Sequence, residues 1–281
     1  MRPPRSGTSW LAANLDGNTL TAWDVAGGTA GVAHVLQLPD SSPAALAAGL
    51  RQALRDQARP VVLGGSALVP PQAVPALAGE RPLTTLELEG LTVRALPGLH
   101  QASPCAVMQG AAARLGGFLR LNPEWDGVIC LVGSMTHWVH VSAREAVSFQ
   151  SSLTGQLAWA AAQGMGLETA GAWDKAALAE AVADGLAKPE LLAARLASVQ
   201  AAAALGQLAE DTARGRLWGL LLGAELAAAR PYWLGQNLAL IADAPLQPLY
   251  TAALEAQGLP VTLADPARMA LEGLMHAWAG N

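Results

Sequence analysis

Two stretches far apart in the sequence follow the same order: an apolar strand, a tight turn and an alternating strand. The first runs from Trp10 to Val25 and turns at the letters DGN, and the second runs from Asp126 to Ser142 and turns at GSM. A short apolar run indicates a buried strand, and alternation with a period of two indicates a strand with one buried face. Each pair is followed by a third strand and then by helix-strand units. The repeat predicts an α/β protein with a duplicated architecture, two domains (1–122 and 123–281) and a cleft between them.

The further elements are predicted from capping residues and apolar runs. Third strands are expected at 31–38 and 145–152, and buried strands at 60–65, 238–243 and 260–264. Helices are expected to begin at Ser42-Pro43, at Asp174, after Pro189, near Leu217, at Pro248 and at Asp265-Pro266, because Ser, Asp and Pro favour helix starts. The segment Ser66–Gly90 is rich in Pro and Gly and gives no clear assignment.

Composition excludes several classes of function. Of the 281 residues 52% are hydrophobic, which can supply a large core, and the net charge of −5 comes without any run of Lys or Arg. Nucleic acid is therefore not an expected partner. The longest apolar helix candidate, about 13 residues from Leu217, contains Glu225 and is shorter than the roughly 20 residues that span a bilayer. No membrane association is predicted, the first residues do not resemble a secretion signal, and the expected location is the cytoplasm.

The two cysteines stand in different contexts. Cys105 lies in a predicted loop and Cys130 in an apolar strand, and neither has a CxxC partner. A disulfide framework, thiol redox chemistry and a structural zinc site are therefore not expected. Cys130 is predicted to be buried and inert.

Six short motifs, taken in order, resemble one family. They are NTLTAW (18–23), PGLH (97–100), VMQG (107–110), GSMTHWV (133–139), LTGQL (153–157) and GLLLGAELA (219–227). Their order and spacing are similar to those of 2-dehydro-3-deoxygalactonokinases, sugar-acid kinases of the actin-like ATPase superfamily. The resemblance implies two ribonuclease-H-like domains, ATP and Mg²⁺ as cofactors, a sugar acid as substrate on the N-terminal side, and phosphate transfer to the 6-hydroxyl of 2-dehydro-3-deoxygalactonate.

The first hairpin departs from the pattern D-x-G-[ST]-T that the family uses for Mg²⁺ and phosphate. Aligned without a gap, Asn14 takes the Asp position and Asp16 the Gly position; with a shortened hairpin, Asp16 is itself the carboxylate. Asn lacks the negative charge that holds a hard cation, and an Asp in the turn repels phosphate. A plain DGN turn without any ligand also accounts for these residues, so three interpretations stay open.

The second hairpin keeps Gly133, Ser134 and Trp138 but has Met135 and His137 where the family pattern has His and Lys. Gly133 and Ser134 can still hold a phosphate, since a turn without a Cβ lets the phosphate approach backbone N–H groups. His137 and His140, three apart on a strand, face opposite sides and cannot readily share a metal ion. Each is expected to be a partly exposed strand histidine.

Other charged family positions are also altered. Gln109, Ala111 and Ala112 stand for Arg and an acidic pair, Gln156 stands for Glu, and Asp243 with Pro245 replaces part of a nucleotide-contacting turn. Gly219 and Gly223, four apart, predict tight helix packing, and Glu225 beside them is either a solvated or capped helix carboxylate or a polar residue near the cleft.

These considerations give a set of expected site residues. The resemblance implies Asp16, Thr136 and His137 as catalytic residues, Asp16 also as the Mg²⁺ ligand, Asn18, Thr19, Gly133, Ser134 and Asp243 as nucleotide contacts, and Gln109, Thr154 and Gly155 as substrate contacts. The alternative is a catalytically impaired relative that binds sugar acid, nucleotide or a partner protein. Apolar surfaces around Trp159 and Trp173 are consistent with a homodimer.

Overall fold

The structure, a computed structural model, describes residues 9–55, 57–79 and 82–280. The expectation about a secretion signal falls on residues 1–8 and lies outside them. The chain forms two compact units: the first contains 1–127, 139–149 and 264–281, and the second contains 128–138 and 150–263. These units reflect packing, and the domain boundary at 122/123 stays a prediction.

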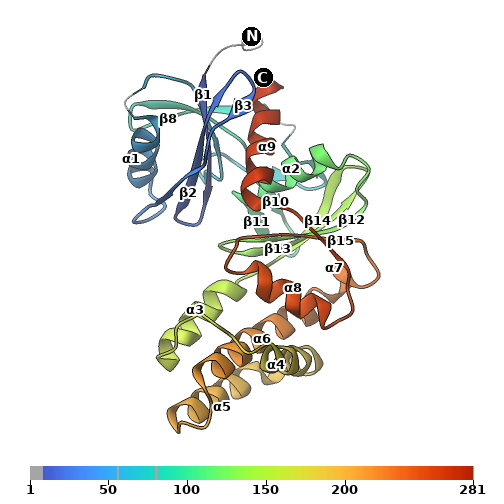
Figure 1. The fold of residues 1–281 in the computed structure, drawn as a ribbon. Helices are drawn as coiled ribbons and strands as arrows, with labels where there is room; N and C mark the ends of the chain where they lie inside the picture. The colour runs from blue at the N-terminus through green and yellow to red at the C-terminus, as the bar shows by residue number, and fades with distance from the viewer. Residues whose placement is uncertain (1–8, 56, 80–81, 281) are drawn as a thin grey trace. The chain divides into compact units, whose positions relative to one another are not determined.

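The first unit is built on a seven-stranded sheet with the path β3-β2-β1-β5-β9-β8, and β4 pairs with β2 (Figure 1). The strands are β1 (Trp10–Asp16), β2 (Thr19–Ala26), β3 (Thr29–Ala30), β4 (His34–Gln37), β5 (Val61–Gly64), β8 (Thr84–Leu88) and β9 (Leu91–Ala95). β1 and β2 form the predicted hairpin, in which Asp16 is paired with Thr19 across the turn. β1 also pairs in parallel with β5, so the carboxyl ends of these two strands are neighbours.

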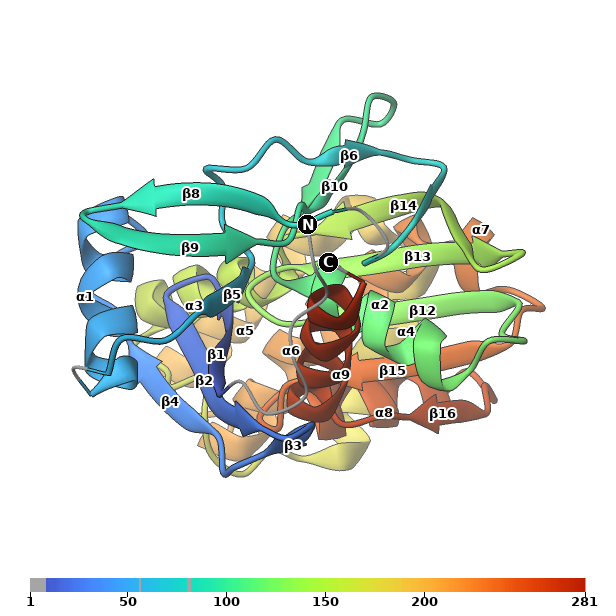
Figure 2. The same ribbon diagram turned by 90° about the horizontal axis from the view of Figure 1, so that it is seen from above.

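Helices cover both faces of this sheet. The helices of the unit are α1 (Pro43–Leu54), α2 (Ala111–Leu121) and α9 (Pro266–Ala279). Along β1, Leu11 and Ala13 pack into the cluster that contains the buried face of α1, whereas Trp10 and Ala12 pack into the cluster that contains α9. This alternation is the period of two expected of a strand, and Figure 2 shows α1 and α9 on opposite sides of β1.

The segment Ser66–Gly90, which the sequence left unassigned, carries short strands. β6 (Gln72–Ala73) joins β10 (Leu99–Gln101) and β11 (Ala106–Met108) in a three-stranded sheet, β7 (Ala76–Leu77) pairs with β14, and β8 begins at Thr84. Strands of two residues carry too little pattern to be read from a sequence.

The remaining sheet has the order β16-β15-β12-β13-β14-β7. Its strands include β12 (Gly127–Val132), β13 (Thr136–Ser142), β14 (Glu145–Ser152), β15 (Leu238–Ala242) and β16 (Val261–Leu263), as predicted. The helices of the second unit are α3 (Thr154–Met165), α4 (Lys175–Ala187), the 3₁₀ turn η1 (Pro189–Leu191), α5 (Leu192–Ala204), α6 (Glu210–Ala228), α7 (Arg230–Trp233) and α8 (Gln247–Glu255). Cys130 is buried in β12 as predicted, and burial raises the pKa of its thiol well above 9.0.

Three predicted helix starts are confirmed by their capping hydrogen bonds. Ser42 Oγ accepts from the N–H of Ala45 at 3.2 Å, Asp174 Oδ1 from that of Ala176 at 2.8 Å, and Asp265 Oδ1 from that of Arg268 at 2.6 Å. Each side chain satisfies a backbone donor that the first helical turn leaves open.

The packing role predicted for Gly219 and Gly223 is also confirmed. α6 lies against α4 (Figure 1), and a Cβ on Gly219 would meet the carbonyl oxygen of Leu178 at 2.5 Å. A Cβ on Gly223 would meet the carbonyl oxygen of Val182 in the same way. Both glycines therefore let the two helix backbones approach directly.

The helices α2 and α3 were not predicted, and α6 begins earlier than expected, at Glu210 instead of near Leu217. Within the described residues, no helix combines the length and apolarity that crossing a membrane requires.

Candidate functional site

The second hairpin of the sequence lies at the edge of a cavity of about 730 Å³ in the second unit. We call this cavity the α3 pocket, because most of its lining comes from the first half of α3 and the residue before it. The lining residues are Gly133, Ser134, Leu153, Gly155, Gln156, Leu157, Trp159, Ala160, Thr169, Trp218 and Leu246. Gly133 and Ser134, predicted to contact nucleotide, thus share one pocket with Gly155, which was predicted to contact substrate.

One end of the α3 pocket is polar and rich in backbone donors. The Gly133 N–H donates to the Met135 carbonyl at 3.0 Å, which closes the turn, and Gln156 Nε2 donates to the Ser134 carbonyl at 3.1 Å. α3 has no side-chain cap, and its first internal hydrogen bond runs from Leu157 to Leu153. The N–H groups of its first residues therefore remain available at the positive end of the helix dipole.

The rest of the α3 pocket is apolar. Leu153, Leu157 and Leu246 line it together with Trp159 and Trp218, and Trp159 is 61% exposed. Such a pocket with a few donors at one end suits a ligand with a flat apolar body and an anionic group.

The two tryptophans on which the homodimer prediction was based, Trp159 and Trp173, have different surroundings in the structure. Trp159 lines the α3 pocket, which accounts for its exposure, while Trp173 is half-buried against the core of the second unit. The homodimer stays a prediction.

Asp243 lies beside the same turn. Its N–H donates to the carbonyl of Val132 at 3.1 Å, which joins the carboxyl ends of the parallel strands β12 and β15. Loops at this edge of a parallel sheet commonly form binding sites. The predicted residues Gly133 and Asp243 are therefore neighbours in space, although more than 100 positions separate them in the chain.

Behind the pocket, four elements are joined through one buried carboxylate, Glu225 of α6. Glu225 Oε1 accepts from Trp138 Nε1 at 2.9 Å, and Oε2 accepts from Tyr250 Oη at 3.0 Å and from the hydroxyl of Thr154. Tyr250 Oη is also 2.6 Å from Thr136 Oγ1. Because Tyr250 gives its proton to Glu225, Thr136 must donate to Tyr250. The carboxylate thus fixes β13, α3 and α8 to α6.

This arrangement decides the question left open for Glu225. The side chain is 5% exposed and is neither solvated nor a helix cap. The interpretation as a solvated or capped helix carboxylate was therefore wrong. The side chain joins buried elements, and it supports the α3 pocket because Thr154 and Gly155 are adjacent in α3.

Burial also perturbs the titration of Glu225. Loss of water raises the pKa of its carboxyl above the ordinary value of 4.5, and the hydrogen bonds from Thr154, Trp138 and Tyr250 offset only part of this shift. With a folded pKa above the unfolded one, the stabilisation linked to this group is complete below pH 4.5 and is lost as the pH rises through the folded pKa.

A matched amide variant should reveal this titration. We expect the free energy of unfolding of the wild type to fall relative to that of Glu225→Gln as the pH rises above 4.5. Urea unfolding of both proteins at a series of pH values measures the difference. A constant difference from acidic to neutral pH would show that Glu225 titrates normally.

Thr136 and His137, the predicted catalytic residues of β13, are both buried. Thr136 is 1% exposed and His137 is 5% exposed, and His137 Nδ1 lies 2.8 Å from Ser151 Oγ. The expectation of a partly exposed His137 was wrong, because its ring is buried and contacts Ser151 of the neighbouring strand β14. His140 is half-buried, as expected. Thr136 or His137 could contact a reacting group only if its side chain became exposed. The catalytic roles of both residues stay predictions.

The first hairpin forms a second group of site residues, within the first unit. Glycines allow three segments to meet beside its turn: a Cβ on Gly65 or Gly110 would collide with the carbonyl oxygen of Leu15. Asn14 is 3% exposed, and its Oδ1 is buried without a hydrogen-bond donor. Asn18 and Thr19 lie at the turn, where Thr19 Oγ1 and Gln37 are hydrogen-bonded at 3.0 Å.

Asp16 makes an ion pair that the sequence did not indicate. Its Oδ2 lies 3.3 Å from Arg114 Nη2 of α2, and the Arg114 side chain is 9% exposed. This pair offsets the repulsion between Asp16 and phosphate that the sequence implied. A Mg²⁺ ion at Asp16 would have to compete with the guanidinium, so this carboxylate fits a resident metal poorly, and its role as a metal ligand stays a prediction.

Gln109, predicted to contact substrate, lies just before α2. Its Oε1 is buried and has no donor, and a Cβ on Gly98 would touch it. Gln109 Oε1 and Asn14 Oδ1 are thus buried acceptors to which no group in the described part of the first unit donates. Buried polar atoms of this kind are uncommon in folded proteins and often mark a place where a ligand or water binds.

Comparison with known proteins assigns the chain to a family. Residues 7–277 match the family described as 2-keto-3-deoxy-galactonokinase. A 2-dehydro-3-deoxygalactonokinase from Escherichia coli (strain K12) is 30% identical over 248 residues, which is 82% of each chain. The chain belongs to the 2-keto-3-deoxy-galactonokinase family.

Solved structures agree on the fold. A crystal structure of a Sinorhizobium meliloti protein assigned as a 2-dehydro-3-deoxygalactonokinase covers 95% of each chain with a TM-score of 0.84 at 24% identity. An activator of 2-hydroxyisocaproyl-CoA dehydratase from Clostridium difficile, with bound ADPNP, covers 96% of this chain and 94% of its own with a TM-score of 0.56 at 9% identity. The predicted actin-like ATPase fold is confirmed.

Proposed function

We propose that the protein transfers the γ-phosphate of ATP to the 6-hydroxyl of 2-dehydro-3-deoxygalactonate. Membership of the family supports the sugar-kinase part of this proposal. The arrangement of the α3 pocket carries the nucleotide part, because uncapped helix N–H groups and a glycine turn lie at one end of a large apolar cavity. The similarly folded dehydratase activator contains ADPNP, an ATP analogue.

In this proposal the α3 pocket holds the nucleotide. The purine packs against Leu157, Trp159 and Trp218, where base stacking on an aromatic ring contributes about 1–3 kcal/mol. The phosphates lie toward Ser134 and Gly155, where backbone donors and the helix dipole favour negative charge. Apart from the neighbouring backbone of α3 itself, no described atom lies within 4 Å of the place where a Cβ on Gly155 would lie, so a phosphate can approach.

The sugar acid is assigned to the first unit. Its hydroxyl groups can donate to Asn14 Oδ1 and Gln109 Oε1, two acceptor atoms for which the described residues supply no donor. Leaving such a buried acceptor unpaired costs about 1–3 kcal/mol, so a substrate hydroxyl that reaches it gains both affinity and selectivity.

Mg²⁺ is assigned to the phosphates of the bound nucleotide. Magnesium usually keeps several waters and binds through substrate phosphates with one or two carboxylates. It would neutralise charge on the transferring phosphate. For these phosphates the chain supplies the uncapped N–H groups at the start of α3.

The test is an ADP-release assay with Mg-ATP and 2-dehydro-3-deoxygalactonate, together with calorimetric titration of Mg-ATP. Turnover that requires the sugar acid supports the proposal and removes the impaired-relative alternative. ATP binding without turnover would contradict the proposed reaction, and would indicate either an impaired relative or a kinase for another substrate. Absence of ATP binding would overturn the kinase proposal.

Two substitutions at Gly155 test the phosphate position. We expect Gly155→Asp to raise the KM for ATP about tenfold or more relative to Gly155→Asn, because the two side chains have the same size but only Asp repels phosphate. Asp near a helix start is favourable for the helix, so stability should not fall. Equal KM values for the two variants would place the phosphates elsewhere.

A further inference from the structure

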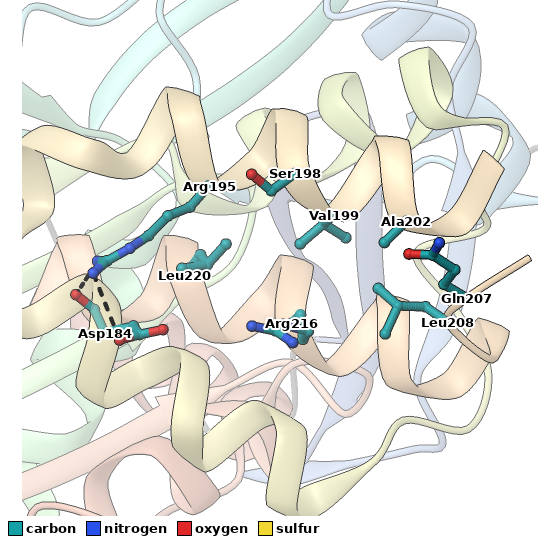
Figure 3. Close-up of a pocket in the computed structure, with 9 residues that line it drawn as sticks. All are labelled: Asp184, Arg195, Ser198, Val199, Ala202, Gln207, Leu208, Arg216 and Leu220. Carbon is teal, nitrogen blue, oxygen red and sulfur yellow. Dashed lines mark hydrogen bonds and ion pairs between the residues drawn. The ribbon is translucent and has the colours of Figure 1, made fainter. Parts of the chain in front are cut away.

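A second cavity, of about 460 Å³, lies among α4, α5 and α6 (Figure 3) and shares no lining residue with the α3 pocket. We call it the three-helix pocket. Its lining residues are Asp184, Arg195, Ser198, Val199, Ala202, Gln207, Leu208, Arg216 and Leu220. The volume lies within the range of about 300–1,000 Å³ that small-molecule sites usually have.

The charges that line this pocket are not balanced. Arg195 pairs with Asp184, with 3.5 Å between Nη2 and Oδ1, and also donates to the carbonyls of Asp184 and Lys188. Arg216 lies on α6, apart from that pair (Figure 3), and is half-buried. Among the described residues its guanidinium has no ion pair or hydrogen bond. The pocket therefore keeps one uncompensated positive charge.

An anion is the partner that this charge lacks. A guanidinium partly removed from water loses hydration that only an acceptor or a negative charge restores. The amide of Gln207 adds a further donor to the lining. Asp184 forms its ion pair with Arg195 and does not neutralise the charge of Arg216.

The rest of the lining is apolar. Val199 is 4% exposed and Leu220 is 3% exposed, and Ala202 and Leu208 extend this surface. A small hydrated ion such as phosphate leaves these side chains unused, whereas a ring or short chain that carries one negative group covers them.

We propose that the three-helix pocket binds a small organic anion with a single carboxylate, held by Arg216, and an apolar body packed on Val199 and Leu220. The site is separate from the proposed nucleotide and sugar-acid sites, and it stands whether or not the kinase proposal holds.

Calorimetric titration of the full chain with benzoate tests the proposal, with benzamide as the uncharged ligand of the same shape and inorganic phosphate as the anion without an apolar body. We expect benzoate to bind with a Kd in the millimolar range, and both controls to bind about tenfold more weakly or worse. No benzoate binding, or equal binding of benzoate and benzamide, would overturn the proposal.

Three variants locate the site. Arg216→Gln should weaken benzoate binding about tenfold, and Arg230→Gln, which removes an exposed arginine of α7 outside the pocket, should leave it unchanged. Asp184→Asn should strengthen binding, since it releases the charge of Arg195 into the pocket. Benzoate affinity that is the same in Arg216→Gln as in the wild type would place the binding elsewhere.

Discussion

Replacing Gly219 by Val should lower the free energy of unfolding by about 3 kcal/mol, because the new side chain forces α4 and α6 apart. The added Cβ would lie 2.5 Å from the carbonyl oxygen of Leu178 and 2.7 Å from Ala181 Cβ. Neither neighbour can move alone, since one is helix backbone and the other is attached directly to it. Urea unfolding followed by circular dichroism measures the loss.

Gly164→Val provides the matched control. Gly164 is also inside a helix, α3, but it is exposed and nothing lies within 4 Å of its Cβ position. Valine has a somewhat higher helix propensity than glycine, so this variant should be as stable as the wild type or slightly more stable. Equal losses at both positions would mean that helix propensity, and not the α4–α6 crossing, dominates at Gly219.

The elements that the sequence predicted correctly are those whose signal is local. The hairpin of β1 and β2 follows from strand alternation around DGN, and α1, α4 and α9 follow from caps in which a side chain meets a backbone N–H two or three residues ahead. Such signals need no knowledge of the rest of the chain.

α2 and α3 lack those local signals. α3 begins after Leu153 without a side-chain cap, and α2 contains Gly116 and Gly117, which lower its helix propensity. The glycines of α2 are explained only by its partner helix, because a Cβ on Gly117 would collide with the carbonyl oxygen of Met269 in α9. In the proposed nucleotide site, the phosphates would accept from the N–H groups that the missing cap of α3 leaves open.

In the candidate site, too, residues with a local sequence signal were predicted and contacts between distant elements were not. Gly133, Ser134 and Gly155 were found from motifs and share one pocket, whereas the motifs gave no indication of Trp218 or of the pair between Asp16 and Arg114. These contacts join residues of different elements, and pairing of that kind is a property of the fold. An arginine within an apolar helix face, as Arg114 is, was the one signal that could have pointed to a partner.

Replacing Glu225 by Ala should be among the most damaging single changes, with a loss of about 3–5 kcal/mol in the free energy of unfolding. Alanine leaves the donors of Trp138, Thr154 and Tyr250 buried without an acceptor, and each unpaired donor costs about 1–3 kcal/mol, reduced where a hydroxyl can turn to a new partner. The loss also frees the start of α3 from α6, so the KM for ATP should rise in the fraction that folds. Urea unfolding and ATP titration of the same preparation measure both effects.

Glu225→Gln separates the hydrogen bonds from the charge. With its amide oxygen at the Oε1 position it can still accept from Trp138. Its NH₂ group, at the Oε2 position, can donate to the hydroxyls of Thr154 and Tyr250, and the Tyr250 hydroxyl then donates to Thr136. We therefore expect this variant to unfold within about 1 kcal/mol of the wild type and to keep its affinity for ATP. If alanine and glutamine were equally harmful, the negative charge itself would be what the site needs; if both were harmless, Glu225 would not hold the α3 pocket in place.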